Sequence, residues 1–227
     1  MQRLVLPINT FKPTAGYKNK KYLRYWKFNH FGIDCVGSDT VYSLGNGVVM
    51  AAGCDGKNGR TTGVTSGCGY VAIVVYKDCE SNKTRKASDL TVTYMHLREM
   101  PKVKAGQTVT KDTVIGYMGN TGAKTTGKHL HLQMDTDTRF WQYCAGLKKR
   151  NYGIFKFAKG GNIDNTVNPV NYLWCDYNQR IITRVSEWYE KADFDRIPKA
   201  KTIAEKPKTE PEKDNIYSGG VIHITAR

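Results

Sequence analysis

The chain has 227 residues, enough for one sizeable domain and an appendage, and its 40% of hydrophobic residues is ordinary for a soluble globular protein. Residues 1–180 carry 26 basic and 12 acidic side chains, whereas residues 181–227 carry 9 and 8, so the positive charge belongs to the first part. Such a field favours polyanions: a nucleic acid, an anionic membrane or an anionic cell wall. No run is long and apolar enough to span a membrane, and residues 4–6 are too short for the apolar region of a signal peptide.

Up to about residue 174 the pattern predicts a β protein. Short apolar or alternating runs rich in Val, Ile, Thr and Tyr are separated by Gly- and Asn-containing turn signals, and no segment has a helical period. We therefore expect a mostly β fold, built as an antiparallel sandwich or an open-barrel-like sheet. The expected strands lie at 40–44, 47–52, 69–76, 90–96, 113–118 and 129–134.

The C-terminal part has a different composition. Residues 168–173 predict a closing turn, and residues 181–194 predict a short helix with Ile182, Val185 and Tyr189 on one face. Residues 199–214 are rich in Lys, Glu and Pro, which is typical of a solvated linker, and residues 221–225 resemble a strand. We therefore divide the chain into an N-terminal extension (1–27), a main domain (28–174) and a C-terminal appendage (175–227).

Six cysteines are scattered without any Cys-x-x-Cys pair, which argues against a zinc ribbon and a thioredoxin-like redox site. Reduced thiols are the default expectation for a chain without an export signal. Cys54 and Cys68 flank a Gly-rich loop and could pair if the protein works outside a cell.

Four of the five histidines lie in three short motifs with metalloenzyme character. His30 and Asp34 are separated by four positions around Gly32, so in an extended segment both side chains share one face and Gly32 leaves the space between them empty. His129 and His131 share a face of another expected strand, whose leucines face the other way into a core.

The sequence Tyr94-Met95-His96-Leu97 ends a third expected strand with one more histidine. Neutral imidazoles with one carboxylate make a ligand set that suits zinc, and catalytic zinc takes three protein ligands and leaves the fourth position to water. The two donors in excess of three fit a hydrolase, which also needs groups that move protons or stabilise an oxyanion.

In these motifs the chain resembles the lysostaphin-type zinc metalloendopeptidases, a family of peptidoglycan hydrolases. The matching segments occur in the family's order and are HFGIDCVG (30–37), LGNGVVMAAG (44–53), YMHL (94–97), VKAGQTVTKDTVIGYMGNTG (103–122) and TGKHLHLQM (126–134). The resemblance implies the family's compact β fold with an active-site groove, a Zn²⁺ cofactor and a peptidoglycan peptide as substrate.

The resemblance also assigns roles to individual residues. It implies that His30, Asp34 and His131 bind zinc, and that His96 and His129 are catalytic, by activating the water or stabilising the tetrahedral intermediate. Which of the two histidines does which stays open. A tyrosine upstream of the first motif assists in some members, and the candidates in this chain are Tyr22 and Tyr25.

The chain departs from the family at two kinds of place. Gln133 stands where the family commonly has a glutamate, which alters the surroundings of the ligand strand but removes none of the five key side chains. The stretches 53–70 and 76–90 are longer than usual, and because such loops wall the groove in the family, substrate preference is where the resemblance is weakest.

The leading hypothesis is therefore a zinc endopeptidase that cuts a stem peptide or a cross-bridge, made in the cytoplasm and released to the wall as a phage endolysin or carried on a virion. A leader removed from a secreted form is the alternative route. A catalytically inactive member that acts as a wall-binding or regulatory scaffold is the second hypothesis, which the complete set of five residues disfavours. Anionic wall polymers fit the basic charge, whereas nucleic acid is not expected because no nucleic-acid-binding motif is present.

Overall fold

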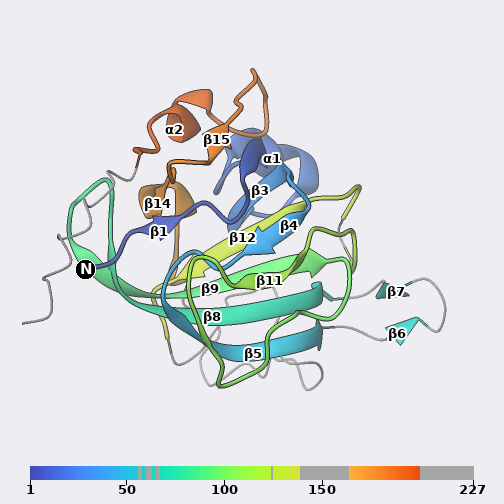
Figure 1. Ribbon diagram of the computed structural model, residues 1–227. Helices are drawn as coiled ribbons and strands as arrows, with labels where there is room; N and C mark the ends of the chain where they lie inside the picture. The colour runs from blue at the N-terminus through green and yellow to red at the C-terminus, as the bar shows by residue number, and fades with distance from the viewer. Residues whose placement is uncertain (56–57, 60–62, 65–66, 124, 139–163, 200–227) are drawn as a thin grey trace, which may run out of the picture.

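The computed structural model describes residues 1–55, 58–59, 63–64, 67–123, 125–138 and 164–199. Most of its strands join one nine-stranded sheet with the order β10-β5-β8-β9-β12-β3-β2-β15, in which β13 also pairs with β12 (Figure 1). Neighbours in this sheet are antiparallel except β15, which runs parallel to β2. The strands are β2 (Thr10–Ala15), β3 (Gly32–Gly37), β5 (Gly47–Asp55), β8 (Gly69–Glu80), β9 (Ala87–Leu97), β10 (Thr108–Val109), β12 (Leu130–Asp135), β13 (Thr166–Val167) and β15 (Arg180–Ile181).

Three two-stranded sheets and three short helices complete the described fold. The pairs are β1 (Leu4–Val5) with β14 (Leu173–Trp174), β4 (Thr40–Tyr42) with β11 (Val114–Tyr117), and β6 (Asn58–Gly59) with β7 (Gly63–Val64). The helices are α1 (Lys20–Trp26), the 3-10 turn η1 (Pro169–Asn171) and α2 (Lys191–Asp195). The mostly β fold expected from the sequence is confirmed, and its sheets stay open rather than closing into a barrel.

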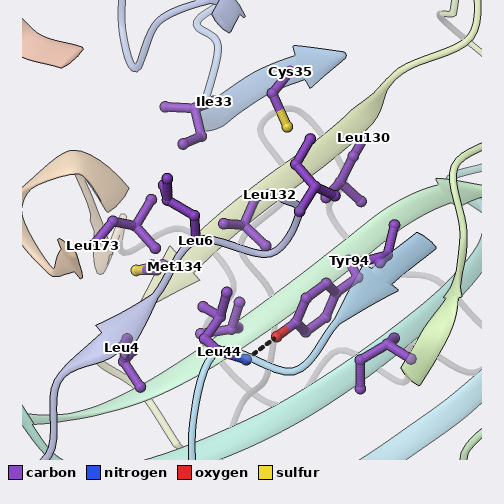
Figure 2. Packing of buried hydrophobic residues seen from close by; sticks show 14 of the residues in the cluster. Leu4, Leu6, Ile33, Cys35, Leu44, Tyr94, Leu130, Leu132, Met134 and Leu173 are labelled. Carbon is purple, nitrogen blue, oxygen red and sulfur yellow. Dashed lines mark hydrogen bonds between the residues drawn. The ribbon is translucent and has the colours of Figure 1, made fainter. Parts of the chain in front are cut away.

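The core lies on one face of the central strands. Along β12, Leu130, Leu132 and Met134 all enter the same buried cluster, which also receives residues of β3 and of the N-terminal segment (Figure 2). Because side chains alternate along a strand, His131 and Gln133 are directed to the opposite face of β12. The core residues of β12 therefore fix the orientation of its histidine.

Two buried tyrosines show how the core accommodates polar atoms. The hydroxyls of Tyr76 and Tyr94 lie 2.6 Å apart, and the Leu44 amide donates to the Tyr94 hydroxyl at 3.2 Å (Figure 2). The Ser43 hydroxyl lies 2.7 Å from that of Tyr76. Buried hydroxyls need such partners, and these bonds join strands β8 and β9 to the segment that follows β4.

All six expected strands are present, as β4, β5, β8, β9, β11 and β12. The pattern did not predict α1, a seven-residue helix that begins at the N-cap Asn19, whose side chain accepts bonds from the amides of Lys21 and Tyr22. It also did not predict β2, although β2 pairs directly with β3. The division at residues 27 and 174 stays a prediction.

The helix expected over 181–194 is wrong in its extent, because only Lys191–Asp195 is helical. Ile181 belongs to β15, and the Ile182 amide donates to the Phe11 carbonyl rather than to a helical neighbour. The hydroxyl of Tyr189 then bonds both the amide and the carbonyl of Arg184, which closes a non-helical loop. Val185 is 94% exposed, so the expected apolar face does not form.

The linker and terminal strand expected beyond residue 199 lie outside the described residues. Cys54 and Cys68 are thiols in the structure, so the pairing left open from the sequence is not seen. Among the described residues, no helix is both long enough and apolar enough to cross a membrane.

Candidate active site

Strands β3 and β12 bring the three expected metal ligands together. His131 and Asp34 are direct partners in the antiparallel register, and His30 lies two residues before β3. The Nδ1 atom of His131 lies 2.8 Å from Asp34 Oδ1, and the Nε2 atom of His30 lies 3.1 Å from the same oxygen. The two nitrogens are 3.0 Å apart, so atoms from β12, from β3 and from the residue two positions before β3 lie close together.

The chemistry of this cluster suits a bound cation. The Nδ1 atom of His30 donates to the Gly16 carbonyl at 2.9 Å, which directs the Nε2 lone pair of the neutral ring toward Asp34 and His131. Two imidazole nitrogens and a carboxylate oxygen thus lie close together. Their lone pairs repel one another unless protons or a metal ion lie between them. Two imidazoles with one carboxylate are a known ligand set for catalytic zinc, so the residues fit that ion.

The electrostatics of the cluster keep the carboxylate ionised. Burial alone would raise the pKa of Asp34, but His30 and His131 hold it well below its usual range. Burial lowers the pKa of His30, but Asp34 and the Gly16 carbonyl outweigh it and raise the pKa overall. Burial lowers the pKa of His131 and outweighs the opposing effect of Asp34.

Gly32 makes room for the cluster, as the sequence suggested. A Cβ atom at this position would lie 2.4 Å from the carbonyl oxygen of Leu132 and 2.7 Å from Nε2 of His131. Both distances are far shorter than an ordinary contact, so the imidazole of His131 occupies the space that a side chain would need.

The two expected catalytic histidines lie side by side at the same site. The ring centroids of His96 and His129 are 4.9 Å apart, and Nε2 of His129 lies 3.8 Å from Asp34 Oδ1. Nδ1 of His96 donates to the Thr121 carbonyl at 2.7 Å, and Nδ1 of His129 donates to the Gly127 carbonyl at 2.8 Å. Each ring therefore has its Nε2 atom left to exchange a proton.

His96 has both a lowered side-chain pKa and a strained backbone conformation. Burial, followed by the neighbouring His131 and His129, lowers the pKa of His96 to about 4, so the ring is neutral at pH 7. Its backbone has φ 62°, in the left-handed region that costs a non-glycine residue about 1–2 kcal/mol. Its amide donates to the Cys68 carbonyl at 3.1 Å. Such strain collects at functional sites, where the surrounding structure maintains it.

The two tyrosine candidates occupy different positions. Tyr22 stacks on His30 with ring centroids 4.7 Å apart and an interplanar angle of 27°. Burial, followed by Asp34, raises the pKa of Tyr22, so its hydroxyl stays protonated. Tyr25 is 66% exposed and contacts Trp26 and Trp188 instead. Of the two, Tyr22 is the one that touches the cluster.

A pocket of about 410 Å³ reaches the cluster at Asp34 and also has His129 in its lining. Thr125, Thr126 and Gly127 line another part of it. The remaining lining is mainly aromatic and includes Tyr22, Tyr25, Trp26, Phe28 and Trp188. No sequence pattern indicated Trp188, which belongs to the expected appendage and lies in no motif.

The structure shows where Gln133 and the long stretch 76–90, two departures from the family pattern, lie. Gln133 is buried on β12, where it pairs with Gly32 in the register. Residues 76–90 are largely the ends of β8 and β9, and no residue of this stretch lines the pocket. The side chain of Asn82, in the turn between these strands, donates instead to the carbonyls of Val170 and Leu173.

The chain is similar to one protein family and to several solved structures. Residues 81–142 match Peptidase family M23. Among solved structures, a zinc-containing peptidase from Vibrio cholerae is 21% identical, with a TM-score of 0.44, and the match covers 59% of this chain and 36% of that one. Lysostaphin from Staphylococcus simulans is 19% identical, with a TM-score of 0.44 and coverage of 74% and 51%.

A variant of the catalytic domain of the prophage-encoded M23 protein EnpA from Enterococcus faecalis is 19% identical, with a TM-score of 0.45 and coverage of 71% and 91%. This chain spans only about a third of the length of the Vibrio cholerae peptidase and about half of the length of lysostaphin. The roles of the five site residues stay a prediction. Residues 81–142, which include His96, His129 and His131, match the model of Peptidase family M23, and this match confirms the resemblance to a peptidase family that the motifs indicated.

Proposed function

We propose that this protein is a zinc-dependent endopeptidase that hydrolyses peptide bonds of bacterial peptidoglycan, in a stem peptide or in a cross-bridge. The observation that carries the proposal is the convergence of His30, Asp34 and His131, whose donor atoms all lie within 4.8 Å of one another. The family match to a peptidase supports it.

His30, Asp34 and His131 would hold the metal ion, and the bond from His30 to the Gly16 carbonyl fixes the orientation of that ligand. Bound zinc lowers the pKa of its water to about 7 and polarises a carbonyl oxygen. The Nε2 atoms of His96 and His129 are the protein atoms that can accept a proton from the attacking water and return it to the leaving amine.

The pocket supports a polymeric substrate that extends past the reacting bond. It is lined on one part by threonine and glycine residues and on another by aromatic rings, so a peptide finds both polar and apolar contacts. The net positive charge of residues 1–180 supports retention on an anionic cell wall. Release as a phage endolysin or transport on a virion remains part of the proposal.

The test is digestion of purified cell walls of several chemotypes, with mass spectrometry of the released fragments. Zinc-loaded protein should release new amino and carboxyl termini from the wall peptides, a chelator should stop the release, and added zinc should restore it. A His96→Ala variant that still binds zinc serves as the inactive control. Wall binding without any release would favour the scaffold hypothesis instead, and digestion unaffected by a chelator would refute the metal role.

A further inference from the structure

The segment between β15 and α2 lies against the active site, although it is far from it in the sequence. Figure 1 shows β15 and α2 at the same end of the sheet as α1. The hydroxyl of Tyr189 donates to the Arg184 carbonyl at 2.6 Å and accepts from the Arg184 amide at 2.8 Å. Tyr189 is itself buried and packs edge-on against Phe194. The residues between 184 and 189 are thus held in one conformation.

The main chain of this segment is linked to a predicted zinc ligand. The Gly16 amide donates to the Trp188 carbonyl at 2.8 Å, and the Gly16 carbonyl accepts from Nδ1 of His30. A Cβ atom at Gly16 would lie 3.1 Å from Cβ of Tyr189, so the two segments touch closely. Gly16 therefore connects residue 188 to His30 by two hydrogen bonds, one between main-chain groups and one from the His30 side chain.

The side chain of Trp188 extends the aromatic part of the pocket. Its ring meets Tyr25 edge-to-face with centroids 5.3 Å apart, and Tyr22 with centroids 6.1 Å apart. Trp188 and Tyr25 line the same pocket as Asp34 and His129. Aromatic rings fixed by edge-to-face contacts present large rigid surfaces at a low entropic cost to a ligand.

We propose that Trp188 is a substrate-binding residue and that, with Tyr25, it forms an aromatic wall against which the substrate peptide packs beside the bond to be cut. This inference rests on the proposed function, since it names a subsite of the same groove. Trp188 lies outside residues 81–142, so this wall is contributed by a part of the chain that the family match does not include.

The peptide is the occupant because of what else lines the pocket. Thr125, Thr126 and Gly127 offer hydroxyl and main-chain groups that can bond peptide amides and carbonyls, while the rings cover the apolar faces of peptide planes and small side chains. Trp188 and Tyr25 line the same pocket as Asp34, so the wall is continuous with the reacting site.

The experiment compares the zinc-loaded wild type with Trp188→Ala, Trp188→Phe and Val185→Ala. The substrates are cross-linked muropeptides released by a muramidase from a wall that the protein digests. Trp188→Ala should raise KM about tenfold and change kcat less than threefold, because packing against a ring is lost while the reacting groups remain. Trp188→Phe should recover part of the loss. Val185, 94% exposed in the same segment, is the matched control, and its variant should behave as the wild type.

Zinc affinity separates a binding role from a structural one. The bond between residues 16 and 188 is a main-chain bond and survives in Trp188→Ala, so this variant should bind zinc as the wild type does. An unchanged KM in Trp188→Ala, or a loss of zinc affinity equal to the loss of activity, would overturn the inference.

Failure of the proposed function has a different signature. If the wild type cuts no wall, titration calorimetry with cross-linked muropeptides, released by a muramidase from the walls of several chemotypes, decides the inference alone. Weaker binding by Trp188→Ala than by the wild type and Val185→Ala would then support the aromatic wall. Equal binding by all variants, or no binding by the wild type, would overturn it.

Discussion

Replacing Gly32 by alanine should weaken zinc binding, although every expected ligand stays in the sequence. The new Cβ would lie 2.4 Å from the Leu132 carbonyl oxygen, whereas ordinary contacts begin at 3.4 Å. The strand pair must therefore separate locally by about 1 Å, and overpacking of this kind costs about 1–3 kcal/mol. The same Cβ would lie 2.7 Å from Nε2 of His131, so the imidazole must shift as well.

A displaced ligand binds its ion weakly. Loss of a supporting contact around a metal ligand typically lowers affinity about 10–100-fold, and we expect Gly32→Ala to fall in this range. Competition with a chromogenic chelator measures the zinc affinity, and thermal unfolding with and without zinc measures the stability. Gly127→Ala is the control, because a Cβ there meets nothing within 4 Å. Wild-type zinc affinity in Gly32→Ala would refute the reasoning from the contact distances.

Three further predictions concern the histidines. His131→Ala should lose zinc, whereas His96→Ala should keep zinc and lose turnover by at least about 100-fold, as expected for a general acid–base residue. Metal analysis measures the first effect and wall digestion the second. A fully active His96→Ala would contradict the catalytic role. His96→Gly should be about 1 kcal/mol more stable than His96→Ala, because glycine relieves the positive φ of this position; chemical denaturation of the two zinc-free variants gives the difference, and a less stable glycine variant would show that no strain is present. His223→Ala should digest walls at the wild-type rate, and a large loss of activity would show that the tail takes part in the reaction.

The site was predictable because its residues follow local rules. The alternation along β12 places Leu130 and Leu132 in the core, and this alone directs His131 to the other face. The strand register then puts His131 opposite Asp34, a pairing of distant segments that the residue types suggested and that periodicity could not reveal.

The parts that sequence reasoning missed depend on distant contacts. The stretch 181–190 has helical spacing, but its amides find partners on β2 and on the Tyr189 side chain, so tertiary contacts override the local preference. The position of Trp188 at the pocket has no local signal, because its ring contacts are with residues 22 and 25, and the chain between them contains every strand of the large sheet except β2.

The two hydrogen bonds that join Trp188, Gly16 and His30 limit how far this protein can be truncated. A fragment trimmed to residues 28–174 would keep all five predicted site residues. It would lack Gly16 and strand β2, which directly precedes Gly16. His30, which is predicted to bind zinc, would lose the acceptor that orients its ring. Fusions of this protein to targeting modules should therefore be joined after residue 197, because Ile197 is still packed in the core.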